Sequence, residues 1–353
     1  MELRIISDIS SFANLNSEYS LMTRQHRDAT PFFTFGWLYS WWRAFQNIHP
    51  VEILCFYKRD KLSFVIPVMF SDIMQFNVKI KKISLLGGGW GVFCIPFGDD
   101  VAGWEEQFIS WLDAKCTHDW DILDLGPLLN SSPQLSELYA ALYNTNRPFK
   151  AEEIQIPYLH INETWQDFLK SKSKNFRRTI KRKESIIFDS NSFKINQVKN
   201  PKPEIIKSTV FEVSRKSWQG EEGFSVSSTR EGKDFYLYLT GQDDISMDLA
   251  FITTEDKCIA YLLGFIQDHV YHAFDTGYDP EYAEYSPGLV LHYHVLKNIS
   301  MHNCNEFNFG FNHDYKNRFE PAFYQAIEVN IYRNKILLNA AKLRSFIKKH
   351  LQI

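Results

Sequence analysis

The sequence predicts a mixed α/β protein built from two duplicated domains, and three observations support this fold class. The chain has 353 residues, more than one domain usually holds. Hairpin-like runs recur at 51–70 and 247–266, each with an Asp-Lys pair at its turn. Both halves then continue with a strand, a helix and a strand. We therefore expect domains at residues 1–150 and 151–353, each a mixed, largely antiparallel sheet flanked by helices.

In the first half, the aromatic run from Pro31 to Phe45 predicts a helix. Trp37, Trp41 and Phe45 recur at four-residue spacing, which puts them on one helical face. The remaining expected strands are 3–6, 52–57, 62–70, 80–86 and 120–126, and the remaining helices are 104–114 and 131–143.

The second half repeats this order. We expect strands at 158–161, 248–253, 258–266, 269–275, 306–310 and 327–332. Helices are expected after Thr164, at 204–218, at 233–239, from Pro287 to about 300 and at 337–350. The second half alone carries the Ser-Pro-Gly helix start and an Asp-Tyr-Lys segment, so we expect the chemistry there.

Composition and charge exclude several classes of protein. A net charge of −3 gives no global field that would attract nucleic acid or an anionic membrane. Five scattered cysteines without C-x-x-C spacing indicate reduced thiols rather than a zinc site or a disulfide framework. No apolar run approaches the roughly 20 residues of a membrane span, and no signal peptide precedes the first strand. These features favour a cytoplasmic protein.

The run Tyr285-Ser286-Pro287-Gly288 predicts an anion-binding helix start. Serine is a good N-cap, proline is favoured at the first helical position, and glycine lets a ligand approach the free N–H groups. An ordinary capped helix is the alternative.

A second candidate site for anions lies at 170–183, where eight of 14 residues are Lys or Arg. The segment is either a solvated helix surface or a phosphate-binding clamp that includes Arg177 and Arg178.

These residues resemble the two-domain GNAT-like acyltransferases of the CelD/BioF2-like group, which are related to the FemAB peptidyl transferases. In the first half the similarity includes Trp41-Trp42, Leu86-Gly87-Gly88 and the Trp120-Asp121 strand. Its specific part is the succession Tyr285-Ser286-Pro287-Gly288, Phe307-Asn308-Phe309-Gly310 and Tyr315-Lys316. The resemblance covers most of the chain and implies two tandem GNAT-like domains.

The resemblance implies an N-acyltransferase that uses acyl-CoA as co-substrate and an amine on a small molecule or nucleotide sugar as acceptor. Surface polysaccharide biosynthesis is one expected setting. The chain departs from the family at Asn308, where Asp is usual, and it lacks the Gln/Arg-x-x-Gly-x-Gly/Ala loop of CoA-dependent GNAT enzymes. An aminoacyl-tRNA donor, as in FemAB relatives, and a non-catalytic binding protein are therefore the alternatives.

Acyl transfer to an amine needs a base, an acid for the leaving group and a seat for the donor's phosphates. We expect Asp275 to be the base, with His272 and Asp279 as alternatives, and Tyr285 or Tyr315 to be the acid. Lys316 is a further catalytic candidate. The expected donor contacts are Ser286, Gly288, Arg177 and Arg178, and the expected substrate contacts are Trp218, His272, Asn308 and Arg318. His292 and His294 are two residues apart on a helix, so no metal pair is expected.

Overall fold

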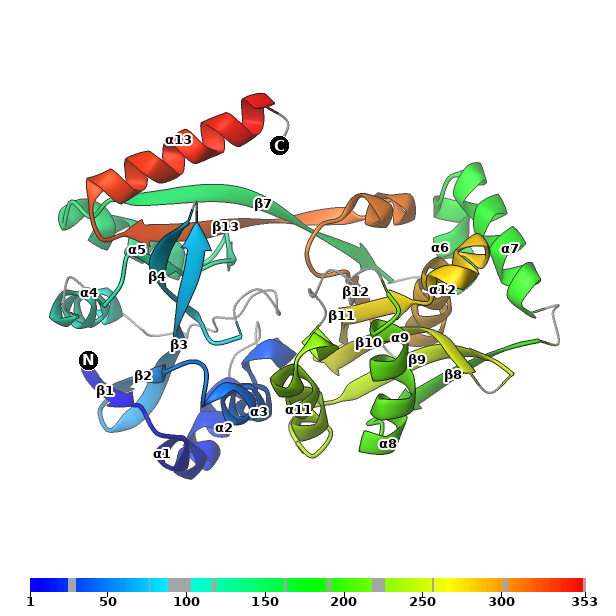
Figure 1. The fold of residues 1–353 in the computed structure, drawn as a ribbon, viewed down its shortest axis with the longest axis horizontal. Helices are drawn as coiled ribbons and strands as arrows, with labels where there is room; N and C mark the ends of the chain where they lie inside the picture. The colour runs from blue at the N-terminus through cyan, green and yellow to red at the C-terminus, as the bar shows by residue number, and fades with distance from the viewer. Residues whose placement is uncertain are drawn as a thin grey trace. The chain divides into compact units, whose positions relative to one another are not determined.

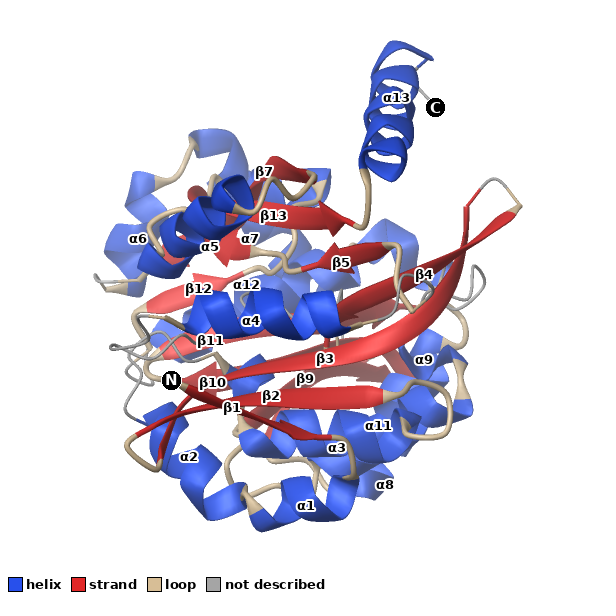
Figure 2. Ribbon diagram, turned by 90° about the vertical axis from the view of Figure 1, so that its left-hand side faces the viewer, coloured by secondary structure: helices blue, strands red, loops and turns tan. Residues whose placement is uncertain are grey.

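The computed structural model describes residues 1–24, 30–75, 77–87, 103–115, 119–161, 164–188, 192–217, 226–255, 257–300 and 304–351. The chain divides into two compact units (Figure 1). Unit 1 comprises Met1–Ile154 and Gln325–Ile353, and unit 2 comprises Gln155–Tyr324. Both units are mixed α/β structures in which helices pack on a β-sheet (Figure 2). The predicted fold class is confirmed.

In unit 1 the strands follow the order β1-β2-β3-β4-β5-β13, and β6 pairs with β13. All of these pairings are antiparallel except that between β4 and β5, which is parallel. The strands are β1 (Glu2–Ile6), β2 (Val51–Lys58), β3 (Lys61–Gln75), β4 (Val78–Leu85), β5 (Ile122–Asp124), β6 (Leu128–Leu129) and β13 (Ala322–Tyr332).

Unit 2 repeats this topology, with the strand order β8-β9-β10-β11-β12-β7. Only β11 and β12 are parallel. The strands are β7 (Phe149–His160), β8 (Phe193–Lys199), β9 (Met247–Thr254), β10 (Lys257–Gln267), β11 (Val270–Tyr278) and β12 (Glu306–Asn308). The two predicted hairpins are β2–β3 and β9–β10.

The compact units differ from the expected halves at the C-terminus. Residues 325–353 belong with unit 1, although we expected them in the second domain. The reason is strand pairing: β13 follows β12 in the chain but pairs with β5, and the final residues of β7 pair with β12. Unit 1 is thus completed by β13, a strand that the predicted division at residue 150 assigns to the second domain.

The helices occupy most of the expected positions. In unit 1 they are α1 (Ile9–Asn14), α2 (Asn16–Arg24), η1 (Pro31–Phe33), α3 (Phe35–Phe45), α4 (Trp104–Ala114), α5 (Pro133–Asn144) and α13 (Lys335–Leu351). In unit 2 they are α6 (Trp165–Ser171), α7 (Lys174–Phe188), α8 (Pro203–Ile206), η2 (Lys207–Phe211), α9 (Glu212–Ser214), η3 (Val226–Ser228), α11 (Arg230–Leu239), η4 (Pro280–Tyr285), α12 (Pro287–Ser300) and η5 (Asp314–Phe319). Within the described ranges, no helix combines the length and apolarity that crossing a bilayer requires.

Each unit has its own apolar core. In unit 1 the hydroxyl of Thr34 caps α3, and Trp37, Trp41 and Phe45 are buried along this helix as the spacing predicts. In unit 2 the apolar face of α12 packs into one cluster with residues of β10 and β12, including Leu262, Leu291 and Phe307. Burying this face fixes α12 on the sheet and thereby positions its N-terminus beside β11.

Candidate active site

The candidate site of unit 2 lies where the pairing between its two parallel strands, β11 and β12, ends. β11 and β12 pair only from Val270–Glu306 to His272–Asn308. Beyond that point β12 ends, whereas β11 continues to Tyr278 and pairs with β10 alone. A register shift in the β10–β11 ladder leaves Phe274 as the extra residue of a bulge. The wall of β11 beyond the last β12 pair is therefore free to face a ligand.

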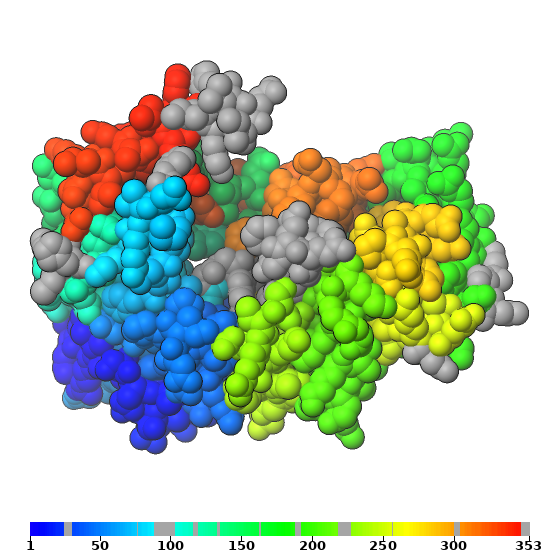
Figure 3. Space-filling view, viewed as in Figure 1, coloured from blue at the N-terminus to red at the C-terminus, as the bar shows by residue number. Residues whose placement is uncertain are grey.

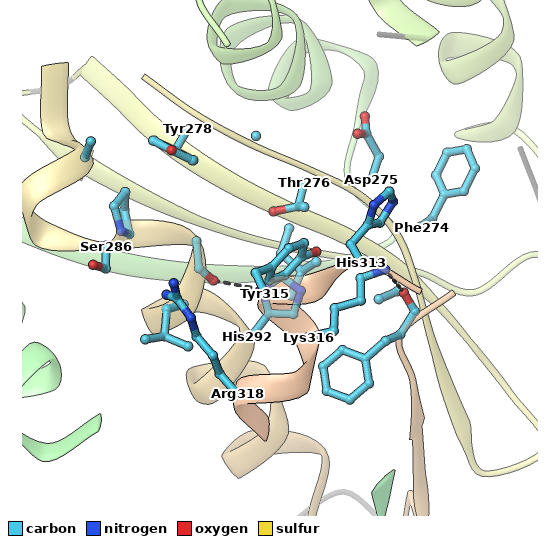
Figure 4. Close-up of a pocket in the computed structure, with 18 residues that line it drawn as sticks. Phe274, Asp275, Thr276, Tyr278, Ser286, His292, His313, Tyr315, Lys316 and Arg318 are labelled. Atoms are coloured by element: carbon cyan, nitrogen blue, oxygen red, sulfur yellow. Dashed lines mark hydrogen bonds between the residues drawn. The ribbon is translucent and has the colours of Figure 1, made fainter. Parts of the chain in front are cut away.

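A cavity of about 510 Å³ lies along this wall (Figure 4). This volume is in the usual range for small-molecule sites. Its lining comes from β10, β11, η4, the first turns of α12 and the segment after β12, and consists of Leu262, Ala273, Phe274, Asp275, Thr276, Gly277, Tyr278, Ala283, Ser286, Pro287, Gly288, Leu289, His292, Phe309, His313, Tyr315, Lys316 and Arg318.

Asp275 contributes a carboxylate to the cavity and is held by two phenols. Tyr236 and Tyr261 donate hydrogen bonds to its Oδ2, at 2.5 and 2.9 Å. Burial raises the pKa of Asp275 above its ordinary value, and the two hydrogen bonds partly oppose that rise. The carboxylate is therefore a stronger base than an exposed aspartate, and its orientation is fixed.

Sequence reasoning missed both phenols, although β11 carries a signal for one of them. Tyr261 lies directly opposite Gly277 in the β10–β11 ladder. A Cβ on Gly277 would come within 2.8 Å of the Tyr261 ring, so only glycine lets that ring cross the strand toward Asp275. In the sequence, Gly277 lies two residues after the candidate base Asp275, and a glycine within a strand indicates that another group approaches the backbone closely. Tyr236 comes from α11 and carries no comparable local signal.

Lys316 is a buried cation of the cavity. Its side chain is 6% exposed, and its Nζ donates to the carbonyl oxygens of Phe309 and Phe311, at 2.6 and 2.5 Å. Among the described residues no carboxylate lies within ion-pair distance of it. Burial lowers the pKa of Lys316 to about 7. Because an ammonium has three donors, one N–H remains for a group in the cavity.

Tyr315 and two histidines surround Lys316. Burial and the charge of Asp275 raise the pKa of Tyr315 to about 12, so its phenol stays protonated. The Tyr315 ring meets His292 edge-on at 5.9 Å and stacks on His313 at 6.3 Å. His292 Nδ1 lies 2.8 Å from the carbonyl oxygen of Gly288, and burial lowers the pKa of His292 to about 4. Both rings near the lysine are thus held in fixed positions.

The N-terminus of α12 forms one end of the cavity. The helix begins at Pro287, as predicted, but Ser286 has a left-handed conformation (φ 53°) and its hydroxyl makes no capping bond within the described chain. Its carbonyl accepts from the N–H of Val290. Within α12 itself, the first turn offers no acceptor to the N–H groups of Gly288 and Leu289. The predicted side-chain cap is therefore wrong. The free N–H groups and the positive end of the helix dipole favour an anion.

Gly288 is not required by the fold. A Cβ there would make only an ordinary contact, 3.9 Å from Tyr278, and the backbone has no positive φ. Arg318, from η5, extends toward the Ser286 side of the cavity in Figure 4. Space at Gly288, two free N–H groups and one guanidinium therefore converge on the same region.

Several expected site residues lie elsewhere. His272 is buried in β11 outside the cavity lining, and burial lowers its pKa to about 3. Tyr285 packs on Phe193, with ring centroids 5.1 Å apart. Asn308 is buried and accepts from the N–H of Gly310, which shapes the turn after β12. Arg177 and Arg178 are exposed on α7 and do not line the cavity, and Trp218 lies outside the described residues.

Asp279 has a structural environment. It accepts from the N–H of Glu281 at the start of η4, and Lys257 and Lys216 lie 3.2 and 3.4 Å from its Oδ2. Burial opposes ionisation of this carboxyl, but the hydrogen bonds with Lys257, the Glu281 N–H and Lys216 lower its pKa overall. It is outside the cavity lining. Of the three candidate bases, Asp275 alone lines the cavity.

The described residues contain no group of three His, Cys, Asp or Glu side chains able to hold a metal ion.

Comparisons with known proteins agree with this architecture. Residues 174–317 match the model of the acetyltransferase (GNAT) domain family, which confirms the resemblance given by the sequence motifs. No curated protein sequence matches the chain.

Three solved structures share the fold at low identity. FemX superposes with a TM-score of 0.59 at 11% identity, over 93% of this chain and 97% of that chain. A C-terminal domain assigned to a lysylphosphatidylglycerol synthetase of Agrobacterium fabrum gives 0.58 at 10%, over 97% of both chains. A tandem GNAT protein from the clavulanic acid biosynthesis pathway gives 0.50 at 10%, over 94% and 99%.

Proposed function

We propose that the chain is an N-acyltransferase that moves an acyl group from acyl-CoA to an amine, because residues 174–317 match the acetyltransferase (GNAT) domain model. The observation that supports it best is the convergence of Asp275, Lys316 and the free N-terminus of α12 on one cavity. These groups provide a base, an acid and an anion site, which are the three requirements of acyl transfer from a phosphorylated donor.

The donor's pyrophosphate would bind at the N-terminus of α12. The N–H groups of Gly288 and Leu289 lie in the first turn of α12 and have no acceptor within that helix, and Arg318 adds a full positive charge. The usual CoA-binding loop sequence is missing. However, the left-handed Ser286 exposes the same kind of backbone donor without it.

Asp275 would take the proton of the attacking amine. The amine nitrogen attacks the thioester carbonyl, a C–N bond forms, and the proton passes to the carboxylate that Tyr236 and Tyr261 hold. The C–S bond then breaks and the sulfur leaves with the electron pair. A carboxyl whose pKa burial has raised is better matched to this task than an exposed one.

Lys316 is better suited than Tyr315 to protonate the leaving sulfur. A thiol has a pKa of about 8.5. An ammonium with a pKa of about 7 gives its proton to such a thiolate downhill, whereas a phenol with a pKa of about 12 does so uphill. Tyr315 would instead donate a hydrogen bond to the developing charge. The catalytic set is therefore Asp275, Lys316 and Tyr315, without Tyr285.

The acceptor would be a small molecule or a nucleotide sugar that carries an amine, because the cavity has the volume of a small-molecule site. Surface polysaccharide biosynthesis is the setting that we propose. We place the protein in the cytoplasm, where acyl-CoA is available, and the free thiols of Cys55, Cys258 and Cys304 agree with a reducing compartment.

Ligand-dependent unfolding and turnover together test the proposal. We expect CoA to raise the unfolding temperature and acetyl-CoA to release free thiol when a panel of amino sugars and amino acids is supplied. Gly288→Leu should fold, because a Cβ at this position makes only an ordinary contact with Tyr278 and the residue lines the cavity, yet lose both effects. Stabilisation by aminoacyl-tRNA but not by CoA would indicate that the acyl donor is an aminoacyl-tRNA and not acyl-CoA. Absence of both effects would leave a non-catalytic binding protein.

A further inference from the structure

The helix α13 of unit 1 carries a stripe of exposed apolar side chains. The helix has 17 residues and is therefore about 25 Å long. Ile336, Ala340 and Leu343 are exposed and recur at the i, i+4 and i+7 positions, which lie on one side of a helix. Ile336 is 79% exposed and Leu343 60%, and Phe346, further along the helix, is also 60% exposed. Single exposed apolar residues are common, but a row of them along one helix indicates an interaction surface.

The opposite side of α13 packs on unit 1. Leu338 is buried, and Ala341 and Ser345, three and seven residues later, are half-buried. Near the start of β7, Lys150 Nζ donates a hydrogen bond to Ser345 Oγ. Figure 2 shows α13 projecting from the sheet of unit 1 beyond the end of β13, and in Figure 3 the helix (red) lies at the surface. The inner side thus attaches the helix to the fold, and the apolar stripe faces outward.

The charged residues of α13 are all of one sign. Its sequence contains five Lys or Arg and no Asp or Glu, whereas the whole chain has a net charge of −3. Lys335 and Lys342 are exposed and lie along one edge of the apolar stripe, and Arg344 lies along the other edge. A surface that only has to be soluble usually mixes both signs of charge. The outer side of α13 is therefore an apolar stripe with cations along its edges.

From this combination we propose that α13 binds the surface of an anionic lipid bilayer, with the helix axis parallel to the membrane plane. Helices of this kind place their apolar side chains at the boundary between headgroups and acyl chains, while Lys and Arg contact the lipid phosphates. Ile336 and Leu343 enter the apolar region, and Lys335 and Lys342 reach the phosphates beside them. The inference goes beyond the proposed function and does not depend on it.

Other occupants match only one of the two properties of α13. A nucleic acid would pair with the cations but leave Ile336 and Leu343 in water. A second copy of the chain, packed stripe against stripe about a two-fold axis, would cover the apolar residues but bring the lysines of both copies together. Such like-charge contacts weaken binding. An acidic polypeptide supplies negative charge but no continuous apolar phase. An anionic bilayer supplies both side by side.

Co-sedimentation of the full chain with vesicles tests the proposal. The vesicles consist of phosphatidylcholine alone or of equal parts of phosphatidylcholine and phosphatidylglycerol, at low and at physiological ionic strength. One test variant, Ile336→Gln/Leu343→Gln, removes the apolar stripe, and the other, Lys335→Gln/Lys342→Gln, removes two charges at its edge. Glutamine keeps the helix propensity high, and all four positions are exposed, so both variants should unfold at the temperature of the wild type.

Each test variant has a matched control. Leu21→Gln/Ile48→Gln removes two apolar side chains that are 62% and 51% exposed elsewhere on unit 1. Lys174→Gln/Lys181→Gln removes two exposed charges from α7, at the same seven-residue spacing.

We expect the wild type to sediment with the anionic vesicles and to stay in solution with phosphatidylcholine alone. Binding should weaken as the ionic strength rises. A cation near such a surface contributes about fivefold in affinity, so Lys335→Gln/Lys342→Gln should bind roughly thirtyfold more weakly at low ionic strength. Ile336→Gln/Leu343→Gln should bind about tenfold or more weakly. Both controls should bind like the wild type.

Three results would overturn the proposal. The first is a wild type that does not bind anionic vesicles, or α13 variants that bind them as tightly as their controls. The second is a dimer in sedimentation velocity that Ile336→Gln/Leu343→Gln dissociates while the wild type ignores vesicles, because the stripe would then join two copies of the chain. The third is binding of soluble polyglutamate as tight as that of anionic vesicles, because charge alone would then explain the interaction.

Discussion

The two units contain the same pair of parallel strands, and they use it differently. In unit 1, β4 pairs with β5 as far as Ser84–Asp124 and ends one residue later at Leu85. In unit 2, β11 pairs with β12 as far as His272–Asn308 and continues for six more residues to Tyr278. The extension of β11 provides the wall of the cavity. In unit 2, the part of β11 that extends past the end of β12 is thus the part that lines the cavity.

Charge distinguishes the units in the same place. At the end of β5, Asp124 accepts from the N–H of Gly126, and its carboxylate pairs with Lys82 at 2.7 Å. After β12, the matching Asn308 accepts from Gly310 in the same way but carries no charge. The charged groups of unit 2, Asp275 and Lys316, are instead held by neutral phenols and carbonyls. Unit 1 neutralises its charge, whereas unit 2 keeps its charges available.

The largest effect is expected at Asp275. Asp275→Asn should lower kcat/KM by roughly 10²–10⁴-fold, because the amide cannot accept the amine proton. Stability at neutral pH should not fall, because the folded state no longer holds a buried charge. The measurement is thiol release together with thermal unfolding. The matched change in unit 1, Asp124→Asn, should cost less than about 1 kcal/mol and leave turnover intact, because its ion pair is part-exposed. If Asp275→Asn and Asp124→Asn lowered turnover equally, the two units would not differ in the way described above.

Lys316→Met should lower turnover about a hundredfold and change the pH dependence of stability. The unfolded chain keeps this proton up to about pH 10.5, whereas the folded protein releases it near pH 7. Between these values the unfolded state binds more protons, so wild-type stability should rise with pH by at most about 1.4 kcal/mol per unit.

Denaturant unfolding across that range should show this slope in the wild type and its loss in Lys316→Met. The basic limb of kcat/KM, which we expect near pH 7, should disappear with it. Lys82→Met in unit 1 serves as the control. If kcat/KM of the wild type does not change with pH near pH 7, Lys316 is not the acid.

Gly288→Ala should move binding and stability in opposite directions. The added methyl group occupies the anion site and should weaken CoA binding by roughly tenfold, whereas alanine in the first turn of a helix should favour folding by at most about 0.5 kcal/mol. Gly103, at the start of α4 in unit 1, has a φ of 88°. Gly103→Ala should therefore destabilise the fold by about 1 kcal/mol without changing CoA affinity. Calorimetric titration and thermal unfolding of both variants test the pair.

The smallest effect is expected at Tyr261. Removing one phenol donor by Tyr261→Phe should raise the pKa of Asp275, since that hydrogen bond lowers it. A hydrogen bond to a charged group contributes about 1.5–3 kcal/mol, so the acidic limb of kcat/KM should move up by about one pH unit. Tyr57→Phe, which removes a phenol of unit 1, should leave the limb in place. An unshifted limb in Tyr261→Phe would show that the phenol only supports packing.

Local patterns predicted much of this protein. Alternating strands, the spacing of Trp37, Trp41 and Phe45, and Pro287 at a helix start each depend on neighbouring residues, so the sequence reveals them directly. The repeat of hairpin, strand, helix and strand predicted the duplicated fold. The motifs around Gly288 and Lys316 located the cavity, because its walls come from one stretch of about fifty residues.

What the tertiary structure decided depends on partners far apart in the chain. The pairing of β13 with β5 is a choice between two similar sheet edges that no local pattern records. Tyr236 and Tyr261 reach Asp275 from other elements, and Tyr285 turns away to pack on Phe193. The sequence by itself determined which polar residues of the second half are candidates for the chemistry. Long-range packing decided which of them face the cavity, and burial there raises the pKa of Asp275 and lowers that of Lys316.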